Sequence, residues 1–218
     1  LLIIDQTPGQ VSSYRRELSL DSALVRDQSV REGFPLTSEK SVREGFPLTR
    51  EFLASAPDGL IAIRLQGSIN CRIALTSQVP HKVKSSTAQL TMTGHATGDA
   101  QESVHFCTML RVETDGQMTA ADSTLTIRGG HEAIVYLVNE TSFNGYDKHP
   151  VREGAPYLER AADAIWHTTN VTYADVRQRH IADYRRFYDR VKLQLGPPAS
   201  SRMSAYHADT PATDRLLK

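Results

Sequence analysis

Residues 141–154 read Thr-Ser-Phe-Asn-Gly-Tyr-Asp-Lys-His-Pro-Val-Arg-Glu-Gly, and this stretch divides the chain into two parts with different patterns. Before it, apolar residues alternate with polar ones, as in β-strands. After it, they recur every three or four residues, as in helices. The stretch, here called the junction loop, combines aromatic rings, an amide, a carboxylate, an ammonium group and an imidazole. Such a mixture suits a sugar-binding loop or a loop that seats one domain against another.

The part before the junction loop predicts short antiparallel strands. The alternating runs recur at regular intervals, and turn residues such as Ala56–Gly59, Asp115-Gly116 and Gly129-Gly130 separate them. This spacing is typical of an antiparallel two-sheet β-sandwich rather than a parallel sheet. One predicted strand begins at Tyr14. The other predicted strands cover residues 51–55, 60–65, 71–75, 88–93, 104–113, 123–127 and 133–138.

A direct repeat interrupts this pattern. Residues 29–37, Ser-Val-Arg-Glu-Gly-Phe-Pro-Leu-Thr, recur identically at 41–49. Two copies are too few for a solenoid core, and Pro35 and Pro47 interrupt any long strand. A repeated binding element is the functional alternative. We favour a recent duplication, or an error in the sequence, in which one copy occupies the strand and the other forms a loop.

The part after the junction loop predicts two helices. In the first, the apolar residues between Tyr157 and Trp166 share one face. In the second, which Thr172 can cap, the apolar stripe runs from Tyr173 to Val191 and ends before Gly196-Pro197-Pro198. Residues 197–218 are rich in Pro, Ser and Ala and predict a linker.

Polar groups on the second helix have structural interpretations. Its arginines alternate with aspartates, which indicates a solvated, ion-paired face rather than a phosphate site. His180 lies on the apolar stripe, so it is interpreted as a core or interface histidine rather than a ligand. The arginines are Arg179, Arg185, Arg186 and Arg190, and the aspartates are Asp175, Asp183 and Asp189.

Composition excludes some partners. The chain has 218 residues with 25 basic and 25 acidic side chains, so charge gives no case for nucleic acid or an anionic membrane. No apolar run approaches the roughly 20 residues that span a bilayer. The opening Leu1-Leu-Ile-Ile is too short for a signal-peptide core. Because the sequence does not begin with Met, we expect a processed chain or a piece of a longer one.

Cysteine spacing gives no metal site, and nothing in the sequence indicates a cofactor. Cys71 and Cys107 are the only cysteines, and strand alternation places them on opposite faces, which disfavours a disulfide. Asn139-Glu-Thr and Asn170-Val-Thr permit N-glycosylation in a secreted eukaryotic protein, although such triplets also arise by chance. We favour a secreted or periplasmic location, and a cytoplasmic one stays open.

The sequence shows no complete catalytic set. Hydrolysis of a glycosidic bond usually needs two carboxyl groups that flank the bond. Asp147 and Glu153 are the only acids that lie beside aromatic residues and a histidine. Nucleophile-elbow, phosphate-loop, dinucleotide and zinc-protease motifs do not occur. We therefore predict no catalytic and no metal-binding residue in this chain.

The junction loop is the candidate binding site. Asn144 can donate to and accept from a sugar hydroxyl, and Phe143 or Tyr146 can offer a ring to an apolar sugar face. Asp147 and His149 can bind further hydroxyls. The structural alternative is that Asn144-Gly145 forms a tight turn and that Asp147 pairs with a neighbouring cation. The loop can also seat one domain against another.

Several segments resemble, in the same order, the amino-terminal region of glycoside hydrolase family 95, the α-L-fucosidases and their relatives. The more specific likenesses are Glu140-Thr-Ser-Phe-Asn-Gly-Tyr-Asp147 and the helical segment 180–193, His-Ile-Ala-Asp-Tyr-Arg-Arg-Phe-Tyr-Asp-Arg-Val-Lys-Leu. The weaker ones are Tyr14-Arg-Arg-Glu-Leu-Ser-Leu-Asp, residues 49–65 and Pro211-Ala-Thr-Asp-Arg-Leu. The duplicated block departs from the family pattern.

The resemblance implies a β-sandwich at 1–140, the junction loop at 141–154, a helical linker at 155–196 and an extended linker at 197–218. These would lead to a catalytic α-helical toroid of the same polypeptide. The family's catalytic residues lie in that toroid, so none can be assigned here. The implied partners are the toroid and a fucosylated oligosaccharide. The alternatives are the amino-terminal domain of a disaccharide phosphorylase and a stand-alone carbohydrate-binding or interaction module.

Overall fold

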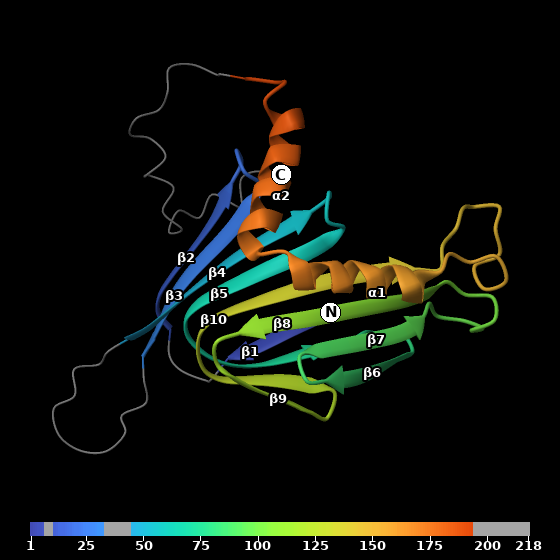
Figure 1. Ribbon diagram of the computed structural model, residues 1–218, viewed down its shortest axis with the longest axis horizontal. Helices are drawn as coiled ribbons and strands as arrows, with labels where there is room; N and C mark the ends of the chain where they lie inside the picture. Colours follow the sequence, from blue (N-terminus) through green and yellow to red (C-terminus); the bar gives the residue numbers. More distant parts are fainter. Residues whose placement is uncertain (7–10, 33–44, 194–218) are drawn as a thin grey trace, which may run out of the picture.

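The computed structural model describes residues 1–6, 11–32 and 45–193 and shows an antiparallel β-sheet with two helices packed on one of its faces (Figure 1). The predicted mainly-β, antiparallel class is confirmed. The main strand order is β2-β3-β4-β5-β10-β8-β7-β6, while β1 pairs with β5 and β9 with β10. The strands are β1 Leu2–Gln6, β2 Val11–Ser19, β3 Leu24–Glu32, β4 Gly45–Ser55, β5 Leu60–Leu75, β6 His81–Ser86, β7 Gln89–His95, β8 His105–Thr114, β9 Gln117–Ala121 and β10 Thr124–Thr141.

Two long central strands build both layers of the fold. β5 has 16 residues and β10 has 18. β5 and β10 pair with each other along most of their length. Residues 60–67 of β5 and 133–141 of β10 also pair with β4 and β8, whereas residues 71–75 of β5 and 124–128 of β10 also pair with β1 and β9. The sheet is therefore continuous, and the second layer consists of extensions of the same strands. The alternating pattern predicts each long strand as two separate strands, which is wrong.

Glycines explain why the strands bend without ending. The ladder between β5 and β10 shifts register on either side of Gly130, which is a β-bulge. Opposite this region, Gly67 has a φ of +131°, and a Cβ there would lie 2.0 Å from the carbonyl oxygen of Pro47. The pair Gly129-Gly130 is thus a bend within a strand and not the predicted turn. Pro47 itself lies inside β4, just beyond the first β4–β5 pair, Leu48↔Gly67.

The larger core lies between the two layers. It gathers one face of β5, β10, β8 and β7 with residues of the β5 and β10 segments that pair with β1 and β9. Ser123, in the β9–β10 turn, closes the layers by donating a hydrogen bond of 3.0 Å to the carbonyl of Val83 in β6. The buried core residues are Leu48, Ile63, Leu65, Ile69, Cys71, Ile73, Leu75, Leu90, Met92, Leu110, Val112, Leu125, Ile127, Ala133 and Val135.

A second core lies on the other face of the sheet, beneath helix α1 (Tyr157–His167) and helix α2 (Tyr173–Tyr188). Ala161 and Ile165 of α1 and Val176 of α2 are buried against it. Cys107 belongs to this core and Cys71 to the larger one, so the two thiols lie on opposite faces, as predicted. Both are unbridged, and burial raises the pKa of each to about 11.

The two predicted helices are confirmed, with a short 3-10 turn, Thr168–Asn170, between them. Thr172 caps α2 in a capping box with Asp175, as the sequence predicted for the cap. The helix ends at Tyr188, before the predicted end near Gly196. Beyond it, Val191 and Leu193 are 76% and 80% exposed, so no apolar contact supports a further turn. No helix in the described part of the chain is long and apolar enough to cross a lipid bilayer.

Hydrogen bonds of polar side chains hold α2 on the sheet. The centre is Glu51 of β4, whose side chain is 7% exposed. Its carboxylate accepts hydrogen bonds from the Tyr173 hydroxyl at 2.9 Å and from Arg177 Nε at 3.0 Å. Arg26 of β3 donates to the other carboxylate oxygen at 2.7 Å. This group, here called the Glu51 cluster, joins two strands to the start of the helix.

The rest of α2 contacts two hairpin turns. Arg179 binds Asp58 in the β4–β5 turn, with Nε 2.9 Å from Oδ1. Tyr184 donates to the carbonyl of Leu20 in the β2–β3 turn at 2.6 Å. His180 is buried, and its Nε2 lies 3.1 Å from the Ser22 carbonyl oxygen, which confirms its interpretation as a core histidine. Three of the four predicted arginines are ion-paired: Arg186 pairs with Asp183 on the helix, as predicted, but Arg179 and Arg185 pair with the β-domain. Arg190 lies over the ring of Phe187.

The repeat is divided between two strands. Ser29–Glu32 of the first copy end β3, and Gly45–Thr49 of the second copy begin β4. These parts pair with each other, from Ser29↔Leu48 to Glu32↔Gly45. The expectation that one whole copy occupies a strand is therefore wrong, because each copy supplies one side of the ladder. Residues 33–44 and the predicted linker at 197–218 lie outside the described residues.

Glu51→Gln tests the Glu51 cluster. We expect the free energy of unfolding at pH 7 to fall by about 2 kcal/mol, less than for a fully buried ion pair, because both arginines keep some exposure to water. Urea denaturation measures it. Glu132→Gln, which removes a half-exposed partner of Arg64, should cost less than about 1 kcal/mol. Equal losses in the two variants would contradict the prediction.

The difference in the free energy of unfolding between the wild type and Glu51→Gln should also depend on pH. Burial by itself raises the pKa of Glu51, but hydrogen bonds from Arg26 and Tyr173 and the charge of Arg177 outweigh it and lower the pKa below 4.5. A lowered pKa stabilises the fold above the unfolded-state value, and this contribution is lost as pH falls through the folded-state pKa. The wild type should therefore approach Glu51→Gln in stability as the pH falls below 4.5.

Candidate functional site

The junction loop is closed at its base by hydrogen bonds to the sheet. β10 ends at Thr141, and the next residue, Ser142, is 3% exposed. Its N–H donates to the His105 carbonyl at 2.8 Å, and its Oγ accepts from the His105 N–H at 2.9 Å. Ala155 then returns to donate to the Ser142 carbonyl at 3.0 Å. The loop therefore begins and ends at the same point beside β8, as in a compact Ω-type loop.

Asn144 and Gly154 hold the two sides of the loop together. Asn144 Nδ2 donates to the Glu153 carbonyl at 2.8 Å. A Cβ at Gly154 would lie 2.1 Å from the carbonyl oxygen of Pro150 and 3.1 Å from that of Ser142. Only glycine fits this close approach of three backbone segments. The amide group predicted to bind a sugar is thus occupied within the loop, although its oxygen has no partner among these contacts.

His149 is the polar centre of the loop. Its Nδ1 accepts from the N–H groups of Val151 and Arg152, each at 3.2 Å. Nε2 therefore carries the proton, and it donates to Glu102 at 2.9 Å. The His149 side chain is 15% exposed. Its role in this structure is to tie the loop to the β7–β8 connection, which leaves it little capacity to bind a sugar hydroxyl.

The other two candidates point outward. Asp147 keeps 60% of its side-chain surface exposed and lies 4.0 Å from Lys148 Nζ, the local pairing that the structural alternative predicted. Phe143 is 58% exposed and Tyr146 is 98% exposed. Of the four predicted site residues, the structure brings Asn144 and His149 together around Glu153 and leaves Phe143 and Asp147 on the surface. Sequence reasoning missed Glu102, which is 47 residues from His149 and belongs to no local motif.

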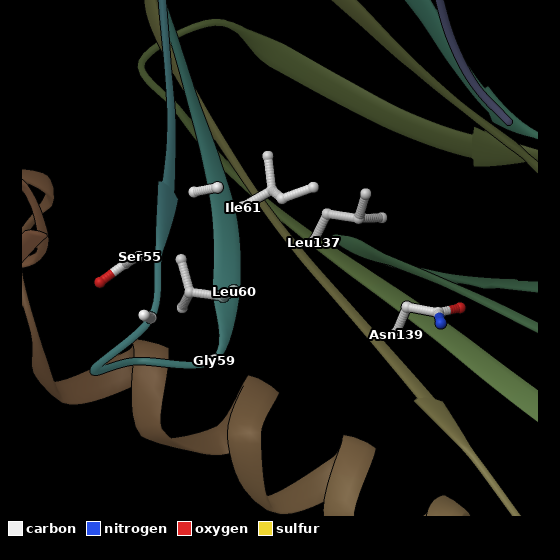
Figure 2. A pocket seen from close by; sticks show the side chains of 8 residues that line it. Ser55, Gly59, Leu60, Ile61, Leu137 and Asn139 are labelled. Carbon is white, nitrogen blue, oxygen red and sulfur yellow. The ribbon is translucent and has the colours of Figure 1, made fainter. Parts of the chain in front are cut away.

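Two pockets lie beside the β4–β5 turn, one on each face of the sheet. The first has a volume of about 360 Å³. Figure 2 shows Ile61 of β5 with Leu137 and Asn139 of β10 along it. Asn139 accepts a hydrogen bond from Thr108 at 2.7 Å, so an apolar wall with one amide faces the pocket. Such a surface fits an apolar side chain better than a sugar, which needs several convergent polar groups.

The second pocket has a volume of about 520 Å³ and lies on the helix face. It is bounded by α1, the 3-10 turn and the β4–β5 turn. Several of its side chains are charged, but Asp58 is already bound by Ser55 and Arg179. The charged and imidazole side chains along it are Asp58, Glu140, Arg160, Asp163 and His167.

The described carboxyl groups whose pKa is shifted lack the property that a general acid needs. A general acid needs a raised pKa, yet each described carboxyl whose pKa is shifted has it lowered. The cause is different in each case: a hydrogen bond from Ser19 for Asp21, backbone N–H groups for Asp115, and the Thr172 hydroxyl for Asp175. The described residues also contain no group of three His, Cys, Asp or Glu side chains that could hold a metal ion.

A domain-family model, a curated relative and a solved structure are similar to this chain. Residues 1–146 match the model of glycosyl hydrolase family 65, N-terminal domain. Alpha-L-fucosidase 2 of Arabidopsis thaliana is 24% identical over 234 aligned positions, which cover 95% of this chain and 26% of the relative. A human-microbiome protein provisionally assigned as a kojibiose phosphorylase has a similar fold, with a TM-score of 0.52 and 14% identity over 82% of this chain and 24% of its own.

The chain therefore spans about a quarter of the length of each of these two proteins. The first match extends past the β-domain into the helices, and the second shows likeness of fold. Family 95 itself, which sequence motifs suggested, is supported by the fucosidase match alone, whereas the domain model is that of family 65.

Gly154→Ala tests the closure of the junction loop. The added methyl group would overlap the Pro150 carbonyl, so we expect the free energy of unfolding to fall by about 2–3 kcal/mol and trypsin to cut faster after Lys148 or Arg152. Denaturation and limited proteolysis measure the two effects. The control is Gly129→Ala, where a Cβ meets nothing within 4 Å and only the φ of +66° opposes the change. Unchanged proteolysis of Gly154→Ala would contradict the prediction.

Proposed function

The chain belongs to the family of glycosyl hydrolase family 65 N-terminal domains, and we propose that it serves as the non-catalytic amino-terminal domain of a glycosidase that resembles the α-L-fucosidases. The observation that carries the proposal is the match to a fucosidase over 95% of the chain. That match includes both helices, which lie beyond the 146 residues of the domain model. The substrate class proposed for the intact enzyme is therefore a terminal α-linked fucose or a related sugar.

Three features support a supporting role rather than a catalytic one. The described carboxylates with shifted pKa values are held ionised, so they cannot donate a proton at neutral pH. The junction loop uses its amide and imidazole for its own closure. Its outward residues, Phe143 and Tyr146, are large and exposed, as expected for side chains that contact a neighbouring domain or the rim of a sugar cleft. We propose that the loop performs one of these two tasks.

The outer face of α1 supports an interface with a catalytic α-helical domain of the same polypeptide. Leu158, Ala162 and Trp166 are four residues apart, so they share one side of the helix. All three are exposed, Trp166 by 67%. The adjoining side of α1, with Ala161 and Ile165, already packs on the sheet, so the single apolar face predicted for this helix is only partly buried. We propose that this stripe is covered in the intact enzyme, and that α2, fixed by the Glu51 cluster, sets the direction in which the chain leaves.

A disaccharide phosphorylase is the second candidate, because the phosphorylase fold covers 82% of this chain. A fold shared at 14% identity does not separate the two activities. They differ in the acceptor of the glycosyl group, which is water in a hydrolase and inorganic phosphate in a phosphorylase. A third candidate, a stand-alone carbohydrate-binding module, predicts that the isolated chain binds sugar.

An assay with 4-nitrophenyl α-L-fucoside tests the proposed activity. The isolated chain should release no nitrophenol, whereas the longer product of the same gene should release it without phosphate. Strict dependence on phosphate, with a sugar phosphate as product, would replace the hydrolase by the phosphorylase. Turnover by the isolated chain would refute the non-catalytic role, and calorimetric binding of a fucosylated oligosaccharide to it would favour the module.

Trp166→Ser tests the proposed interface. In the isolated chain we expect the stability to change by less than about 0.5 kcal/mol, because the ring is mostly exposed. In the longer protein the melting temperature should fall by several degrees, because a buried aromatic contact is lost. Tyr14→Ser, a change of a similarly exposed ring on the edge strand β2, is the control and should leave both forms unchanged. Equal melting of wild type and Trp166→Ser in the longer protein would contradict the proposal.

A further inference from the structure

A pair of histidines faces each other at the base of the junction loop. His95 is the last residue of β7, and His105, the first of β8, is its direct partner in the ladder. The centroids of the two rings are 5.7 Å apart, and their planes are inclined by 36°. Both residues are partly buried and line a recess of about 300 Å³, together with Pro80, His81, Lys82, Thr93, Gly94 and Tyr157.

Backbone carbonyls fix the tautomer of both rings. His95 Nδ1 lies 2.8 Å from the carbonyl oxygen of Ala96, and His105 Nε2 lies 2.7 Å from that of Ala100. A carbonyl oxygen only accepts, so these nitrogens carry the protons. The other ring nitrogens, His95 Nε2 and His105 Nδ1, therefore carry lone pairs. Metal-binding histidines are oriented in the same way, with one nitrogen on the ion and the other donating to a carbonyl or carboxylate.

Only a weak contact competes for the lone pair of His105. The Tyr157 hydroxyl is 3.5 Å from Nδ1, at the limit for a hydrogen bond. Burial raises the pKa of Tyr157 above its ordinary value of 10.0, so the phenol stays neutral and can turn away. The ring of Tyr157 stands edge-on to His105, with centroids 6.2 Å apart, and it shields one side of the recess.

We propose that His95 and His105 together bind one divalent transition-metal ion, of the class Zn²⁺, Ni²⁺ or Cu²⁺, for which imidazole is a preferred ligand. When two imidazole nitrogens bind one ion at about 2.0–2.1 Å, their ring centroids lie roughly 5–6 Å apart, and the centroids of His95 and His105 are 5.7 Å apart. Since the described residues hold no third His, Cys, Asp or Glu ligand for such a group, water completes the coordination. The proposal does not depend on the proposed function.

The ion would act on the junction loop through the backbone of His105. The backbone of that residue forms two hydrogen bonds with Ser142, one donated by the His105 N–H and one accepted by the His105 carbonyl. An ion that fixes the ring of His105 to β7 would stiffen the point at which the chain leaves the sheet. An ion that binds only the folded state also raises the free energy of unfolding, and this gain increases with the logarithm of the ratio of ion concentration to Kd.

Titration of the untagged, chelator-treated chain with zinc chloride in a calorimeter tests the site. The wild-type chain should bind one zinc ion more tightly than any other. His95→Gln and His105→Gln should each raise the Kd of this tightest site at least tenfold. His131→Gln is the control, because His131 is 87% exposed and lies beside Asp115 at the far end of β8. The proposal fails if His131→Gln removes the strongest binding, or if a His95→Gln/His105→Gln double variant binds as tightly as wild type.

Electron paramagnetic resonance with one equivalent of copper(II) supplies an independent readout. The wild-type spectrum should show two nitrogen ligands, and each single variant should show one. Circular dichroism without metal checks that the variants are folded. His95 lies at a strand end, so His95→Gln should fold even if the change at His105 disturbs the junction loop. A wild-type spectrum identical to that of His95→Gln would overturn the proposal.

Discussion

The bend in β5 and β10 is the constraint on which the rest of the structure depends. A 16-residue strand is long enough to pass through more than one layer, and it does so here because its partner bulges at the same height. Glycine at 67 admits the close approach of the Pro47 carbonyl, and glycine at 116 admits that of the Gly130 backbone. The larger core forms because the sheet curls over its own face, so it needs no second, independent sheet. Everything that reaches solvent at the end of β10, including the junction loop, is positioned by this curvature.

The two helices are attached in different ways to the face of the sheet opposite the larger core. α1 rests on an apolar core, whereas α2 is held largely by charge-assisted hydrogen bonds that Glu51, Asp58 and the β2–β3 turn receive. Hydrogen bonds of this kind are directional. They therefore fix the rotation of α2 about its axis more closely than apolar packing alone would. This accounts for the fixed position of α2, although Phe187 and Tyr188 near its end are 54% and 42% exposed.

Much of the fold was predictable from local pattern, and the exceptions have physical causes. The helices, the Thr172 cap and the opposite faces of Cys71 and Cys107 follow from periodicity. The two long strands did not, because a Gly-Gly pair is an ordinary turn signal and only the partner strand turns it into a bulge. Short strands at the edges, β1, β6 and β9, have too few alternating residues to stand out. The repeat could be placed only when its two copies were seen to pair with each other.

The candidate site was less predictable than the fold. The residue types in the junction loop indicated groups that can form hydrogen bonds, but the sequence could not show that Asn144 and His149 would use theirs to close the loop itself. That outcome depends on Glu102 and His105, which come from another part of the chain. The tautomers of His95 and His105 likewise depend on carbonyl groups in the β7–β8 connection. Long-range contacts of this kind leave no local signal.

The position of β2 has a practical consequence. This strand stands at one end of the strand order, and both of its faces are exposed, including Tyr14 and Leu18. Among the described residues no strand pairs with the outer edge of β2, and an open strand edge is a template on which a second copy can add its own strand. The ion pair between Arg15 and Glu17 and the neighbouring Arg16 place charge along that edge, which opposes such stacking. Salt that screens these charges should therefore promote self-association of the isolated domain, so concentrated preparations are better kept at low ionic strength.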